Sequence, residues 1–118
     1  MRKGDIILAN LGQGEGHEQG GTRPVLVVQN EIANNNSNTV TIVPFTDTEH
    51  KKTKLPTHLN IKPTSKNRLL KNSTALCESI STISKTRILK DTYGRLNEAT
   101  MKEIDKRIKI HLDMFKED

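Results

Sequence analysis

Arg23 is the side chain of this sequence with the clearest capacity for chemistry. It stands in EQGGTRPVLVVQN (residues 18–30), between a double glycine and a proline. The proline disfavours helical geometry at residue 23 and brings no N–H to the start of the Val/Leu run that follows. A guanidinium on this restrained backbone can meet a phosphate, or it can pair with Glu18 or Asp47 in a purely structural role. The residues alone leave both interpretations open.

Other kinds of site have less support. The loop 12–21 holds five glycines, but it matches neither G-x-G-x-x-G nor a Walker A motif, and a strand rather than a helix follows it. The four histidines show no metal-ligand spacing: His17, His50, His58 and His111. We therefore expect no metal and no cofactor. The single cysteine, Cys77, can form no internal disulfide, and we predict a buried apolar role for it.

The elements that must position Arg23 are predicted to be short strands. A length of 118 residues indicates a single domain, residues 1–118. Alternating or β-branched runs predict five strands, at residues 5–11, 25–29, 39–45, 57–61 and 73–83. The Val/Leu run of the second strand predicts that both of its faces are buried. Residues 34–38 are predicted to form a turn. Pro44 confines the end of the third strand to an edge or a bulge. The pattern favours a small, bent antiparallel sheet or barrel.

The C-terminal part of the sequence predicts a helix over 98–116. One apolar face is formed by residues at steps of three and four: Met101, Ile104, Ile108, Leu112 and Phe115. Asn97 can cap the first turn, and Leu96 with Met101 has the spacing of a hydrophobic staple. We expect this helix to cover the sheet.

Charge and composition indicate a polyanionic partner. The net charge is +5, and residues 51–71 carry seven Lys or Arg and no Asp or Glu. Only 32% of residues are hydrophobic, so a second copy of the chain could complete the core, and a homodimer is plausible. Neither a signal peptide nor an apolar run long enough to cross a bilayer is apparent, so we expect a cytoplasmic protein with no membrane association.

The segment around Arg23 resembles the signature of the MazF/PemK family of bacterial toxin endoribonucleases, in particular its Gram-positive branch. The resemblance begins with KGDIILANL (residues 3–11) and continues through VPFTDT, KLPTHLNI and ALCESISTISKTRI to the terminal helix. It covers essentially the whole chain.

This resemblance implies a mainly β fold, an SH3-like small β-barrel of the CcdB/MazF type with added helices. It also implies a homodimer that cuts single-stranded mRNA at short sequences without a metal or a ribosome, as the toxin of a type II toxin–antitoxin system. The antitoxin of such a pair has an acidic, disordered C-terminal tail that occupies the RNA groove. The catalytic arginine of the family falls on Arg23 and its catalytic threonine on Thr46.

These residue types suit metal-free RNA cleavage, in which the adjacent 2′-hydroxyl attacks the phosphorus. The reaction leaves a 2′,3′-cyclic phosphate and a 5′-hydroxyl, so the enzyme supplies only proton transfer and charge stabilisation. A guanidinium offers several N–H donors and a threonine hydroxyl adds another. Because arginine is a poor base, Glu18 is our candidate for assisting removal of the 2′-hydroxyl proton, although a salt bridge would explain it equally well.

Recognition of bases requires other groups, which the resemblance places on the wall of the RNA groove. The candidates are Gln19, Asn30, Lys54, Leu55, Pro56, Thr57, Ser73 and Ser79. Each of them could equally be a solvated surface residue. Many relatives carry Gln where this sequence has Ser79, so the cleaved sequence cannot be taken from a relative.

Two other functions remain open. A toxin family with a similar barrel blocks DNA gyrase without being an enzyme, but its members resemble one another in a Trp-containing C-terminus, and this chain has no Trp. A plain RNA-binding barrel would bind RNA and leave it whole.

Overall fold

The described part of the chain consists mainly of antiparallel strands, with short helical segments between some of them and a longer helix after the last. The structure is a computed structural model that describes residues 1–12, 20–48 and 54–114. In chain order its elements are β1 (Asp5–Asn10), β2 (Thr22–Val27), α1 (Glu31–Asn36), β3 (Thr39–Asp47), β4 (His58–Ile61), β5 (Ser73–Leu76), the 3₁₀ turn η2 (Cys77–Ser79), β6 (Ser81–Ser84), the 3₁₀ turn η3 (Lys85–Arg87), β7 (Ile88–Arg95) and α2 (Glu98–His111).

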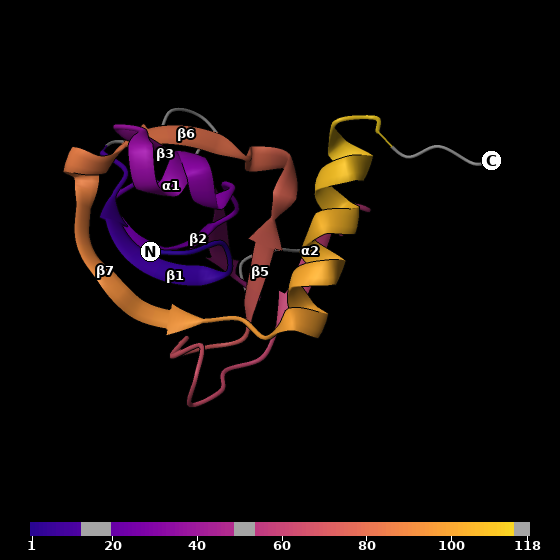
Figure 1. The fold of residues 1–118 in the computed structure, drawn as a ribbon. Coiled ribbons are helices and arrows are strands. Elements are labelled where there is room, and N and C mark those ends of the chain that lie inside the picture. The colour runs from indigo at the N-terminus through magenta and orange to yellow at the C-terminus, as the bar shows by residue number, and fades with distance from the viewer. Residues whose placement is uncertain (13–19, 49–53, 115–118) are drawn as a thin grey trace.

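The strands form one antiparallel sheet in the order β4-β5-β3-β2-β1-β7, with β6 paired to β3. Figure 1 shows β6 and β7 curving around β1, β2 and α1, while α2 lies outside, beside β5. This confirms the predicted mainly β, barrel-like fold with a C-terminal helix, although the path of paired strands is open rather than a closed cylinder.

The third strand changes partners along its length. Residues 39–42 of β3 pair with β6, and residues 45–47 pair with β5. Pro44 lies between these two ladders, opposite Val25 of β2. Because proline has no N–H to donate, it fits the place where one side of β3 exchanges one neighbour for another. The sequence predicted that Pro44 would interrupt the strand pairing at an edge or a bulge. It did not predict that β3 exchanges β6 for β5 as its neighbour there.

Two apolar clusters fill the two faces of the sheet. One contains Leu26 and Phe45 and packs against α2, and the other contains Val25, Val27 and Ile42. The alternation of β2 between these clusters confirms the prediction that both of its faces are buried.

Helix α2 begins as predicted. The Asn97 side chain accepts a hydrogen bond from the Thr100 N–H at 2.8 Å, and Leu96 and Met101 pack into the same apolar cluster as the fully buried Ile104. The helix ends at His111, before the predicted end at residue 116. Leu112 is exposed, and Phe115 lies outside the described residues. None of the described helices has the length and apolar character needed to cross a membrane.

Three segments differ from their predictions. Residues 31–36 form α1, although residues 34–38 were expected as a turn; Asn30 caps this helix, and its side chain accepts from the Ala33 N–H at 2.9 Å. The strand expected over residues 73–83 is broken at η2 into β5 and β6. Strand β7 was not predicted, because its sequence, ILKDTYGR, mixes charges and a glycine and most of its residues are exposed.

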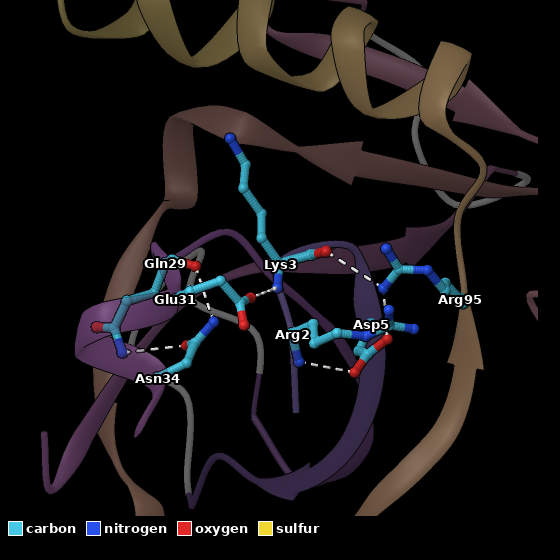
Figure 2. A network of polar contacts seen from close by, with 7 residues as sticks. All are labelled: Arg2, Lys3, Asp5, Gln29, Glu31, Asn34 and Arg95. Atoms are coloured by element: carbon cyan, nitrogen blue, oxygen red, sulfur yellow. Dashed lines mark hydrogen bonds and ion pairs between the residues drawn. The ribbon is translucent and has the colours of Figure 1, made fainter. Parts of the chain in front are cut away.

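The N-terminal turn joins three elements by polar contacts (Figure 2). Arg95 of β7 donates through Nη1 to Asp5 Oδ1 at 2.6 Å and to the Lys3 carbonyl at 3.2 Å. The Arg2 N–H donates to Asp5 Oδ2 at 2.8 Å, and the Lys3 N–H donates to Glu31 Oε1 of α1 at 3.2 Å. These contacts fix the end of the sheet opposite to that of Arg23.

Candidate active site

The Arg23 guanidinium is held by backbone carbonyls on two sides. Its Nε donates to the Gly20 carbonyl at 2.9 Å, and its Nη1 lies 3.4 Å from the Phe45 carbonyl. Gly21, with φ of +78°, turns the chain just before the strand, a conformation that glycine adopts without strain. Residue 23 lies within β2 in extended geometry, as Pro24 predicts. The side chain is half-buried, so its orientation is fixed but it is not sealed in the core.

Thr46 lies beside Arg23 on the neighbouring strand. The ladder between β2 and β3 ends at the pair Val25–Pro44, and Arg23 and Thr46 each lie two residues beyond it, so by alternation both share the face of that pair. Residues opposite one another on antiparallel strands share a face, so the guanidinium and the hydroxyl belong to one face of the sheet. The structure therefore brings the two predicted catalytic residues together.

Further polar side chains continue this face across the sheet. Thr46 is opposite Thr74 of β5, which is opposite Asn60 of β4. The Thr48 hydroxyl donates to Asn60 Oδ1 at 3.1 Å and lies 3.1 Å from the Thr74 hydroxyl. Thr48, Thr74 and Asn60 carried no separate signal of a site in the sequence. Alternation along each strand was readable, but the register that aligns the three strands was not.

The acids considered as partners of Arg23 are only partly described. Asp47 lies 3.5 Å from Lys71, through Oδ2 and Nζ, and alternation along β3 puts it on the face opposite to Thr46. Glu18, the candidate proton acceptor, and Gln19, a candidate base reader, lie outside the described residues. Their predicted roles therefore remain predictions.

The segment before β4 lies near the same face. Lys54, Leu55 and Pro56 are exposed, whereas Thr57 is buried and donates its hydroxyl to Glu78 Oε1 at 2.8 Å. Ser79, at the end of η2, is half-buried directly after Glu78. Two separate parts of the predicted RNA groove, residues 54–57 and Ser79, are thus joined through Glu78.

Two predicted base readers lie elsewhere. Asn30 caps α1 beyond the far end of β2 from Arg23, and its side-chain oxygen is engaged by that cap. Ser73 is buried, alternates onto the face of Ala75, and donates its hydroxyl to the Lys71 carbonyl at 2.9 Å. The structure does not bring these two residues together with Arg23 and Thr46.

The pKa values of two neighbouring residues in η2, Cys77 and Glu78, shift in opposite directions. Burial, followed by the negative charge of Glu78, raises the pKa of the Cys77 thiol to about 12, so this thiol stays protonated and is a poor nucleophile. Burial acts to raise the pKa of Glu78 as well, but hydrogen bonds from His58, from its own backbone N–H and from Thr57 outweigh it and lower that pKa from 4.5.

The described part of the basic run is exposed, but some of it lies away from this face: the Lys66 carbonyl accepts from the Arg95 N–H, Arg68 lies over the Tyr93 ring of β7, and Lys71 pairs with Asp47. Lys54, Lys62, Lys66, Arg68 and Lys71 of the basic run are exposed, while Lys51 and Lys52 lie outside the described residues. Such a surface attracts a polyanion in a salt-dependent way. Within the described ranges no three His, Cys, Asp or Glu side chains gather as metal ligands. A fixed guanidinium with a neighbouring hydroxyl can stabilise negative charge on a phosphate.

Comparison with protein families gives one match along almost the full chain. A family model described as "PemK-like, MazF-like toxin of type II toxin-antitoxin system" matches residues 2–112. Two curated relatives named Endoribonuclease MazF are similar in sequence. That of Staphylococcus saprophyticus is 42% identical over 114 residues, covering 97% of this chain and 92% of the relative. That of Staphylococcus epidermidis is 41% identical over the same coverage.

Solved structures with the same fold are more distant in sequence. An endoribonuclease in complex with its cognate antitoxin from a mycobacterial species has a TM-score of 0.79 at 22% identity, with 99% of each chain covered. MazF from Deinococcus radiodurans has a TM-score of 0.78 at 19% identity, with 97% of each chain covered. At these identities the likeness concerns the fold.

Proposed function

The chain belongs to the PemK-like, MazF-like toxins of type II toxin–antitoxin systems, and we propose that it is an endoribonuclease that cuts single-stranded mRNA, without a metal ion and independently of the ribosome. The observation that carries this proposal is the shared face of Arg23 and Thr46, with Arg23 Nη1 at 3.4 Å from the Phe45 carbonyl next to Thr46. The sequence contains no Trp, whereas the gyrase-blocking toxins resemble one another in a Trp-containing C-terminus, so the gyrase alternative has less support.

In the proposed reaction the 2′-oxygen of one nucleotide forms a bond to the adjacent phosphorus, and the bond from phosphorus to the 5′-oxygen breaks. The proton of the 2′-hydroxyl leaves and another reaches the departing 5′-oxygen. The products are a 2′,3′-cyclic phosphate and a 5′-hydroxyl. Arg23 and Thr46 donate hydrogen bonds to the phosphate oxygens as their negative charge increases, an effect that strengthens towards the transition state.

Proton transfer is assigned to a separate group. Arginine keeps its proton at all physiological pH values, so it stabilises charge and does not act as a base. We assign assistance with the 2′-hydroxyl proton to Glu18, which precedes the double glycine in sequence. Base recognition falls to the exposed segment 54–56, Gln19 and Ser79, with Thr57, Asn30 and Ser73 as weaker candidates because their side-chain polar atoms are engaged within the fold.

The proposed partners follow from charge and family. The net charge of +5 and the basic residues between 54 and 71 suit RNA and, in competition with it, the acidic tail of a cognate antitoxin. We further propose a homodimer that acts in the cytoplasm, where mRNA is available. Light scattering after size-exclusion chromatography would show twice the chain mass of 13.3 kDa for the dimer.

The test is cleavage of a mixed-sequence single-stranded RNA by purified protein in EDTA. We expect cuts at a short recurring sequence, with 5′-hydroxyl ends that accept phosphate from polynucleotide kinase without prior phosphatase treatment. Intact RNA, or cleavage that requires added divalent ions, would contradict the proposal. RNA that is bound but not cut would instead indicate the plain RNA-binding barrel.

A further inference from the structure

A buried histidine links the two segments expected to read RNA bases. The side chain of His58 is only 3% exposed. Its Nδ1 accepts a hydrogen bond from the Leu55 N–H at 3.2 Å, and its Nε2 lies 2.8 Å from Glu78 Oε2. Because Nδ1 is an acceptor, the neutral ring carries its hydrogen on Nε2 and donates it to Glu78. One tautomer therefore satisfies both contacts.

Glu78 uses its two oxygens for two different donors. Oε2 accepts a hydrogen bond from His58 Nε2, and Oε1 accepts one from the Thr57 hydroxyl at 2.8 Å. The hydrogen bonds from both side chains help to lower the pKa of Glu78, so the carboxylate is charged and accepts at both oxygens at neutral pH. A chain of hydrogen bonds thus runs from the Leu55 backbone through His58 and Glu78 to Thr57.

Backbone contacts tie the same residues to η2 and α2. The Cys77 N–H donates to the Thr57 carbonyl at 3.2 Å, and the His58 N–H donates to the Leu55 carbonyl at 3.0 Å. Arg107 of α2 donates through Nε to the His58 carbonyl at 3.0 Å. The turn at residues 55–57 is consequently fixed relative to η2, which ends at Ser79.

This assembly lies on the face that carries Arg23 and Thr46. Three neighbouring strands carry directly paired residues on this face: Thr46, Thr74 and Asn60. His58 is two residues from Asn60 and therefore on the same face of β4. Two strand spacings of about 4.8 Å and two residues of about 3.4 Å place the backbone of His58 roughly 12 Å from that of Thr46. His58 is therefore too far away to touch the same phosphate, but near enough to affect how neighbouring bases are held.

We propose that His58 and Glu78 are paired positioning residues that hold the backbone of residues 55–57 and Ser79 in the arrangement that reads RNA, and thereby determine which sequence is cut. This inference rests on the proposed endoribonuclease function. Recognition of a base edge depends on hydrogen-bond geometry, so a shift of this turn weakens discrimination between bases more than it weakens the reaction at Arg23.

Glu78→Gln and Thr57→Val test the pairing with nearly isosteric changes. An amide at residue 78 offers only one accepting oxygen for two donors. If His58 changes tautomer to accept from that amide, its Nδ1 can no longer accept from Leu55. Thr57→Val removes one donor and leaves His58 in place, so it provides a second variant should the first fail to fold. The matched control is Glu31→Gln. Glu31 lies on α1, and its carboxylate accepts a hydrogen bond from the Lys3 N–H.

The measurement is the sequence profile of cuts in a mixed RNA pool, with kcat and KM on the best substrate and circular dichroism to establish folding. For either variant we expect the preference for the best sequence over single-base changes to fall about tenfold, the size set by one ordinary hydrogen bond, and KM to rise by more than kcat falls. Glu31→Gln should retain the wild-type profile.

Folded variants with the wild-type profile and KM would overturn the positioning role, as would a fall in kcat alone. Either result would leave the endoribonuclease proposal standing, because the wild type would still cut at a definite sequence. If the wild type cuts no RNA, both proposals are wrong.

Discussion

Arg23 and Thr46 are held on one face of the sheet at the junction of β2 and β3, where Arg23 Nη1 lies 3.4 Å from the carbonyl of Phe45. The arrangement follows from local features. The turn at Gly21 and the extended geometry imposed by Pro24 orient residue 23, and the change of partner at Pro44 leaves Thr46 paired with β5 instead of β6. The charge-stabilising pair is thus placed by the backbone of two adjacent strands.

Thr46→Val should lower kcat for RNA cleavage by about 100-fold, towards the lower end of what the loss of one transition-state hydrogen-bond donor causes. Valine keeps the shape and β-propensity of threonine, so the fold should be retained. Thr39→Val, at the other end of β3, is the control for a lost hydroxyl. Equal single-turnover rates for wild type and Thr46→Val would remove the hydroxyl from the mechanism.

Glu78 should make stability depend on pH at the acidic side. Its pKa is lowered from 4.5 by folding, so between the lowered value and 4.5 the unfolded chain binds more protons than the folded one. Stability therefore rises with pH through that window, and the contribution is lost as pH falls below 4.5. In urea titrations wild type should be more stable than Glu78→Gln at pH 7, and this difference should shrink at pH 4. The same difference at both values would contradict the assignment.

Gly94→Ala should destabilise the chain by about 1–3 kcal/mol, as overpacking commonly does. A Cβ at residue 94 would lie 2.2 Å from the Asn67 carbonyl oxygen, because the segment before β5 packs tightly against β7. The Asn67 side chain fixes that segment by accepting from the Thr64 and Leu69 N–H groups. Thr92→Ala, on an exposed part of β7, is the control, and equal urea midpoints for the two variants would show that the contact is not rigid.

Asn97→Ala should cost about 0.5–2 kcal/mol, the usual effect of removing an N-cap side chain. The change frees the Thr100 N–H, which Asn97 Oδ1 accepts at 2.8 Å, and loosens the first turn of α2. Since α2 covers the apolar cluster around Ile104, the loss should appear in the global unfolding curve rather than only as fraying. Asn97→Asp, which keeps the accepting oxygen, should retain most of the stability.

The predictions from sequence succeeded where a local signal decided the structure. The apolar run of β1, the Val/Leu run of β2, and the cap and staple of α2 act over a few residues and were read correctly. The setting of Arg23 was likewise readable, because the glycines and the proline act on the adjacent backbone.

Features that depend on pairing between distant segments could not be read in the same way. Strand β7 carries little apolar signal of its own and is held by β1, and the break at η2 arises where the chain passes from one part of β3 to another. The link between His58 and Glu78 joins residues 20 positions apart, and only the register of β4 with β5 brings them together.

The most direct test is single-turnover cleavage, in EDTA, of one RNA oligonucleotide containing the mapped site, by wild type, Arg23→Ala and Arg2→Ala. Arg2 is an exposed arginine at the opposite end of the sheet and controls for loss of one positive charge. We expect Arg23→Ala to fold, to bind the RNA, and to cut about 100- to 1000-fold more slowly, with Arg2→Ala close to wild type. A folded Arg23→Ala that cuts at the wild-type rate would contradict the central role of this guanidinium.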